Sequence, residues 1–249
     1  MINYLTAEIG RIFKRPPLYI ALTFIILISI MNVIFTLVMS LTQNTAVTAD
    51  MAANVSARLF LNKFVAVITV YAVTAFTSEA GSNTVANAVA VGYTKNTIFI
   101  TKLIVGILEI MLITVSSMIA TLLMVTIWFD DVFTLMMMWQ SVLKHVIAMT
   151  VYIAIYVTAL TIRYLVNNMM LFTVLYFTLV LIVTEIASVL VEYSILPELT
   201  AYFIPTSQLE MLAAESSAKI MGITIGASAA YGILTASAGA AILSKKDIL

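Results

Sequence analysis

The chain has 249 residues, with 12 Lys and Arg against 12 Asp and Glu, so its formal net charge is zero. Only 10% of the residues are charged and 63% are hydrophobic, whereas soluble domains carry about 25% charged residues, so the composition excludes an ordinary soluble protein. The even charge balance gives no sign of nucleic acid binding, and the lack of cysteine excludes disulfides, a thiolate nucleophile and a cysteine metal site.

Residues 1–16 predict an interfacial helix that lies on the membrane surface. Polar side chains, Glu8 among them, are expected to face away from the lipid, and Pro16 and Pro17 are expected to end the helix and turn the chain into the first span. The alternative is that these residues form an ordinary cytoplasmic tail that does not lie on the membrane. The apolar residues recur every three or four positions: Ile2, Leu5, Ile9, Ile12 and Phe13.

Six apolar stretches are long enough to cross a bilayer, which requires about 20 helical residues. The predicted fold class is therefore an all-α polytopic membrane protein, with one transmembrane domain over residues 1–249. The third stretch exceeds one crossing and is expected to tilt or to project beyond the membrane. The predicted spans are 18–41, 59–77, 98–128, 139–165, 169–190 and 220–243.

Residues 191–219 are unusually apolar for a loop between two spans. The pattern from Ser207 to Glu210 suggests a capping box that opens a short helix. We expect this extracellular region to re-enter the outer leaflet, with its backbone polar groups covered by protein. In the last span, Gly222 and Gly226 form a G-x-x-x-G pair that favours close helix packing, either within the monomer or in a dimer.

Lys and Arg concentrate in cytoplasmic loops, and this bias predicts the orientation. With both termini inside the cell, only Arg58, Lys63, Lys144 and Lys219 fall outside, and the other Lys and Arg residues lie inside. The predicted location is a bacterial plasma membrane. Lys63, Lys144 and His145 lie near the outer ends of their spans, where snorkelling to the headgroups is expected.

No catalytic motif occurs in the chain. With one histidine there is no H-E-x-x-H zinc site, no G-x-S-x-G nucleophile elbow occurs, and no Gly-Lys dipeptide is present to form a P-loop. Glu109 and Glu185 lie inside spans, where a carboxylate costs about 2.5–3.5 kcal/mol. They are predicted either to line a substrate path or an interface, or to be protonated or hydrogen-bonded within the bundle.

A polar segment at residues 79–97 separates the second and third spans. Together with the surface helix and the six spans, it resembles the ABC-2 family of transporter permeases, whose loop after the second span reads Glu-x-x-x-Gly-Thr-[apolar], then Gly-x-[Ser/Thr]-[Arg/Lys], then a lysine. The matching residues are Glu79, Gly81, Thr84 and Val85, then Gly92, Tyr93, Thr94 and Lys95, and finally Lys102. Ala80 and the inserted Ser82 and Asn83 depart from the pattern.

The resemblance implies that residues 79–97 form a coupling helix seated in a separate ATPase subunit, which binds ATP and Mg²⁺ in place of this chain. The chain would then be no enzyme itself and would work as a homodimer or with a second permease. Small permeases that export peptides such as phenol-soluble modulins, and bacteriocin-immunity permeases, look similar and imply an amphipathic peptide substrate. The implied ATPase contacts are Glu79, Gly81, Asn83, Thr84, Asn87, Gly92, Tyr93, Thr94 and Lys95.

Two other function classes are compatible with six spans. The first is a secondary transporter or channel that uses Glu109 and Glu185 as proton or ion sites, although the sequence offers neither matched broken spans nor a filter sequence. The second is an intramembrane enzyme, which the missing nucleophile and metal motifs disfavour.

Overall fold

The computed structural model describes residues 2–14, 16–42, 48–77, 87–166, 168–196, 198–214 and 217–245. All regular secondary structure in these residues is helical, and six stretches are long and apolar enough to cross a membrane. They lie close to the predicted spans, so the chain is an all-α polytopic membrane protein. The stretches are Leu18–Thr42, Val55–Ala75, Lys95–Trp128, Leu135–Leu165, Met169–Glu192 and Ala218–Lys245.

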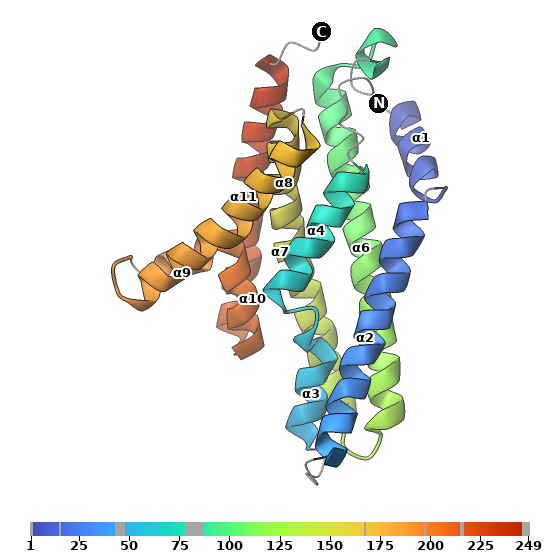
Figure 1. The fold of residues 1–249 in the computed structure, drawn as a ribbon, viewed down its shortest axis with the longest axis vertical. Coiled ribbons are helices and arrows are strands. Elements are labelled where there is room, and N and C mark those ends of the chain that lie inside the picture. Colours follow the sequence, from blue (N-terminus) through green and yellow to red (C-terminus); the bar gives the residue numbers. More distant parts are fainter. Residues whose placement is uncertain are drawn as a thin grey trace.

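The helices form an elongated bundle, with α1 and the last turns of α11 at one end and α3 at the other (Figure 1). We call these the α1 end and the α3 end. In chain order the helices are α1 (Ile2–Ile12), α2 (Pro16–Thr42), α3 (Ala49–Arg58), α4 (Lys63–Thr77), α6 (Lys95–Trp128), α7 (Leu135–Leu165), α8 (Met169–Phe177), the π-helix η1 (Thr178–Val183), α9 (Thr184–Glu192), the 3₁₀-helix η2 (Glu198–Phe203), α10 (Pro205–Ala214) and α11 (Ala218–Lys245).

Helix α7 is the centre of the bundle. It packs against α3, α4, α6, α8, α10 and α11, and most of its membrane-spanning stretch is buried. Two of its buried tyrosines reach other elements: the Tyr152 hydroxyl donates to the carbonyl of Phe60 (3.0 Å) and the Tyr156 hydroxyl to the carbonyl of Lys102 (2.8 Å). By contrast α2, α11 and the stretch Met169–Glu192 are mostly exposed, which suits helices that face lipid.

The second span is broken, which the sequence did not predict. Helix α3 ends at Arg58 and α4 begins at Lys63, so residues 59–62 form a turn inside the stretch expected to be one helix. The Asn62 side chain caps α4 by accepting hydrogen bonds from the backbone N–H groups of Phe64 (2.9 Å) and Val65 (3.3 Å). No proline or glycine lies at the break, so tertiary contacts have to maintain it.

Phe60 anchors this break. Its side chain is 1% exposed and stacks on Tyr152, with ring centroids 4.3 Å apart and planes 5° from parallel. His145 stacks on the same ring at 5.2 Å and is buried, so it does not snorkel to the headgroups as expected. The Tyr152 hydroxyl also donates a hydrogen bond to the Phe60 carbonyl. This backbone carbonyl of the turn therefore has a hydrogen-bond partner inside the bundle.

Helix α10 begins at Pro205, not at Ser207, so the predicted capping box is wrong. Proline is favoured at the first helical position, where its missing N–H costs nothing. The Ser207 hydroxyl bonds instead to the Ser188 hydroxyl of α9 (2.8 Å). The buried Gln208 side chain donates to the Tyr202 carbonyl (2.6 Å) and accepts from the Ser228 hydroxyl (2.7 Å), which ties α10 to η2 and α11.

The glycines that allow close helix packing are not the predicted pair. A Cβ on Gly222 or Gly226 would meet no atom of the described chain within 4 Å, so packing through this pair within the monomer is wrong and the dimer alternative stays a prediction. On Gly239 a Cβ would lie 2.6 Å from the Thr161 hydroxyl, and on Gly106 it would overlap the Tyr156 ring. Close approach therefore occurs between α7 and its neighbours α6 and α11.

We expect Gly106→Ala to lower the stability of the bundle by about 1–3 kcal/mol, because the new methyl group displaces the buried Tyr156 ring. Thermal unfolding of the purified chain in detergent measures this loss. Gly10→Ala is the matched control, because Gly10 is an exposed helical residue with open space around its Cα. Equal melting temperatures for the two variants would contradict the packing described for Gly106.

Candidate functional site

The described part of the predicted coupling segment is a helical turn closed by a glycine. Residues 87–90 are helical and Gly92 takes a φ of +97°, which L side chains rarely adopt. The Tyr93 N–H donates to the Ala88 carbonyl (3.1 Å) and the Gly92 N–H to the Val89 carbonyl (2.9 Å). These two bonds form a Schellman motif, so Gly92 ends the helical turn.

The chain then enters α6 directly. Thr94 is the N-cap of this helix, and its hydroxyl accepts a hydrogen bond from the Thr97 N–H (3.2 Å). Lys95 is the first helical residue, so the turn and the 34-residue helix α6 are joined without a flexible linker. At about 1.5 Å per residue, α6 is roughly 51 Å long and exceeds the hydrocarbon core of about 30 Å.

Residues 87–95 have an inner and an outer face. Ala88 is buried, and Val89 and Tyr93 pack against the main core of the bundle. Asn87 and Val91 are exposed, with 76% of the Val91 side chain accessible. Ala90 and Thr94 are exposed as well, so the outer face offers apolar, amide and hydroxyl side chains to the surroundings, while the inner face rests on the bundle.

The inner face touches α1 through two aromatic rings. The centroids of Tyr4 and Tyr93 lie 4.7 Å apart with planes at 33°, within the range of favourable aromatic pairs. Further along α1, the buried Ile12 packs with Leu18 of α2 and Val105 of α6. The first helix is thus packed on the bundle along its length.

A buried ion pair fixes α1 to α6. Glu8 and Lys102 are 2% and 3% exposed, and the Lys102 ammonium lies 2.6 Å from the Glu8 carboxylate. The other carboxylate oxygen accepts a hydrogen bond from Arg11 at 2.8 Å. Glu8 was expected on the polar face away from the lipid; it faces α6 instead, because Lys102 supplies the charge that its burial requires.

Glu109 lies on the same side of α6, two helical turns beyond Lys102, and is 7% exposed. Between them, Gly106 receives the Tyr156 ring, and the Tyr156 hydroxyl bonds to the Lys102 carbonyl. Glu109 is therefore buried on the face of α6 that also carries Lys102 and Gly106, and its part in a substrate path or an interface stays a prediction.

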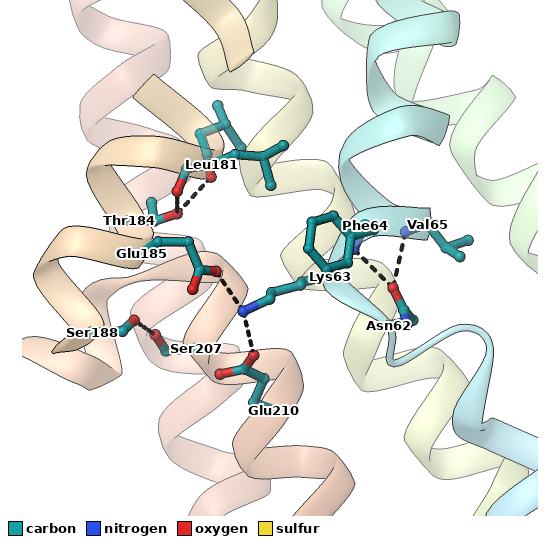
Figure 2. Close-up of polar contacts among 11 residues, drawn as sticks. Asn62, Lys63, Phe64, Val65, Leu181, Thr184, Glu185, Ser188, Ser207 and Glu210 are labelled. Atoms are coloured by element: carbon teal, nitrogen blue, oxygen red, sulfur yellow. Dashed lines mark hydrogen bonds and ion pairs between the residues drawn. The ribbon is translucent and has the colours of Figure 1, made fainter. Parts of the chain in front are cut away.

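A second polar cluster lies at the break of the second span. The Lys63 ammonium forms ion pairs with Glu185 of α9 and, at 2.8 Å, with Glu210 of α10 (Figure 2). Lys63 was expected to snorkel to the headgroups. Glu185 was expected either to line a path or an interface or to be protonated or hydrogen-bonded within the bundle. Figure 2 shows Lys63 extending from α4 towards both carboxylates, so the three residues join three helices. We call them the Lys63 cluster.

The two intramembrane glutamates lie in different surroundings, because Glu185 pairs with Lys63 at the break whereas Glu109 is buried on α6. Four of the predicted ATPase contacts, Glu79, Gly81, Asn83 and Thr84, lie outside the described residues. Sequence reasoning missed the roles of Tyr4, Glu8, Lys102, Lys63 and Glu210. The available signal was the presence of opposite charges in apolar segments, each of which requires a partner.

Among the described residues, no group of three or more His, Cys, Asp or Glu side chains is arranged to hold a metal ion. No protein-family model matches the chain, and comparison with curated proteins finds no match.

We expect Glu8→Gln to release α1 from α6, because it leaves the buried Lys102 ammonium without its carboxylate at a cost of about 3 kcal/mol. Hydrogen exchange of residues 2–14 in the purified chain measures the release. Lys14→Ala, which removes an exposed charge, is the control. The double variant Glu8→Gln with Lys102→Met should restore slow exchange; unchanged exchange in Glu8→Gln itself would refute the ion-pair attachment.

The chain has no cysteine, so a disulfide can test the position of α9 directly. We expect Ser188→Cys with Ser207→Cys to oxidise readily, because the two hydroxyl oxygens are 2.8 Å apart. Free-thiol counting by mass spectrometry after mild oxidation measures this. Ser188→Cys with Ser237→Cys, whose second position is exposed on α11, is the control pair and should stay reduced. Two free thiols in the first pair would show that α9 does not lie against α10.

Proposed function

We propose that this chain is the membrane permease subunit of an ATP-driven exporter of amphipathic peptides, energised by a separate nucleotide-binding subunit. The proposal rests on the ABC-2-like sequence pattern that ends in Gly92, Tyr93, Thr94 and Lys95, and on the absence of a P-loop from the chain. ATP and Mg²⁺ would be bound by the partner, and this chain would perform no catalysis itself.

The observation that carries the proposal is the connection of residues 87–95 to two other elements. The segment continues into α6 through the Thr94 cap and touches α1 through Tyr93. Glu8 and Lys102 in turn join α1 to α6. A displacement of this segment by a partner would therefore move α1 and α6 together, which is the task of a coupling helix.

The outer face of the segment suits contact with a partner. Val91 is exposed although it is apolar. Asn87, four residues before it, is also exposed, and its amide can donate and accept hydrogen bonds. The implied contacts Gly92, Thr94 and Lys95 follow at once in the chain. This pairing of apolar and amide side chains is suited to a cleft on another subunit.

Three finer features belong to the same proposal. Helix α1 would be an interfacial elbow, and α10 with η2 a re-entrant segment whose Gln208 satisfies backbone and side-chain groups inside the protein. Both termini would lie in the cytoplasm of a bacterial cell, since this orientation leaves the fewest Lys and Arg outside. A homodimer, or a pair with a second permease, would complete the transporter.

One observation favours a second candidate function, a secondary transporter or channel. The second span is interrupted at residues 59–62, and Lys63 at this break pairs with Glu185. Discontinuous helices and intramembrane charges mark the ion and substrate sites of many secondary transporters. In that case Glu185→Gln would abolish flux driven by a proton gradient with no ATPase present.

We expect Val91→Asp to abolish co-purification of the proposed ATPase subunit from the cell that produces this chain, because a charge would be buried unpaired in the contact. The measurement is recovery of the ATPase on the tagged permease in detergent, with a loss of at least about tenfold expected. Lys219→Asp is the control, because Lys219 is exposed at the start of α11, away from residues 87–95.

Equal recovery of the ATPase with both variants would show that residues 87–95 are not part of the contact with the ATPase. No recovery with the unmodified chain would contradict the subunit arrangement as a whole.

A further inference from the structure

A pocket lies beside the break of the second span. It has a volume of about 260 Å³ and is lined by Ala57 and Arg58 of α3, Leu61 of the turn, Lys144 of α7 and Ala213 of α10. Helices α3, α7 and α10 pack against one another around it. The pocket therefore lies where the end of α3 and the turn at residues 59–62 meet α7 and α10.

Two cations share this pocket. The Arg58 guanidinium belongs to an exposed residue at the end of α3, and the Lys144 side chain is half-buried. Within the described chain, neither side chain has a hydrogen bond or an ion pair with a protein acceptor. The nearest acid along α10 is Glu210, one turn from Ala213, and Lys63 already pairs with it.

The missing acceptor has an energetic consequence. Arg58 and Lys144 both belong to stretches that are apolar enough to span a membrane. A cation within a span costs about 2.5–3.5 kcal/mol at the helix centre, and such residues normally pair inside the protein. The described residues supply no carboxylate to either cation, so the pocket presents two positive charges to an anion from outside the chain.

We propose that this pocket binds the phosphate of an anionic membrane lipid. A guanidinium binds phosphate with two parallel hydrogen bonds and an ammonium adds a point charge, so the pair suits one phosphate group. Basic pockets between transmembrane helices are established sites for lipid head groups. The source is a lipid because both cations lie towards the α3 end of membrane-spanning stretches, where lipid head groups border the hydrocarbon core.

The site is independent of the proposed export function, because it requires neither an ATPase nor a peptide. It also differs from the Lys63 cluster, where one cation meets two carboxylates and no positive charge is left over. The two clusters flank the same turn with opposite charge balance, so an anion is expected only beside Arg58 and Lys144.

Binding of phosphatidylglycerol to the purified chain in detergent, counted by native mass spectrometry, tests the proposal. We expect Arg58→Gln and Lys144→Gln each to weaken binding at least about tenfold, and the double variant to bind phosphatidylglycerol no better than phosphatidylcholine. Lys14→Gln is the control, because it removes an exposed cation at the opposite, α1 end of the bundle, and it should bind as the unmodified chain does.

The variant Lys144→Arg keeps both the charge and the hydrogen-bond donors and should retain binding, so it separates a lost anion site from a misfolded chain. Undiminished phosphatidylglycerol binding in the double variant would overturn the proposal. If inorganic phosphate at millimolar concentration displaced phosphatidylglycerol, the pocket would bind free phosphate, and the proposal that its ligand is a lipid would be wrong.

Discussion

Lipid offers no hydrogen-bonding partner, and this constraint determines how the polar groups of the six spans are arranged. Three buried tyrosines meet it by bonding to backbone carbonyls of other elements. Tyr152 bonds to Phe60, Tyr156 to Lys102 and Tyr176 to Val67. Each bond joins two spans at a fixed point, so the same contacts that satisfy polar groups also set the relative positions of α4, α6, α7 and α8.

The constraint explains why a break in the second span is tolerated. The turn at residues 59–62 frees backbone groups, and Tyr152 and Asn62 satisfy part of them while Phe60 fills the space between two rings. The break in turn places Lys63 where it can reach α9 and α10, and leaves Arg58 beside Lys144. One local departure from helix thus generates both charged clusters.

The spans could be predicted from the sequence because their length and apolar composition are decided locally. The end of the turn at Gly92 was also predictable, since few other residues adopt a φ of +97°. The break was not, because residues 59–62 contain neither proline nor glycine and the stacked rings of His145 and Tyr152 come from a distant part of the chain.

The partners of the charged residues depend on tertiary structure for the same reason. Glu8 appeared to belong to a polar face, yet its acceptor role is defined by Lys102, which lies 94 residues later. The sequence shows Gly222 and Gly226 as a pair in α11, but only packing shows that Gly106 and Gly239 are the positions where a ring or a hydroxyl approaches the backbone. Sequence identifies which groups need a partner, and the fold determines which partner they find.

The central claim is that movement of the spans is driven through residues 87–95 by a separate ATPase. The most direct measurement is uptake of a fluorescent amphipathic peptide into inside-out vesicles that contain this chain, with and without the ATPase subunit. The account predicts uptake only when ATPase and ATP are both present, with no response to a proton gradient. Equal uptake without the ATPase, driven by a proton gradient and lost in Glu185→Gln, would contradict it.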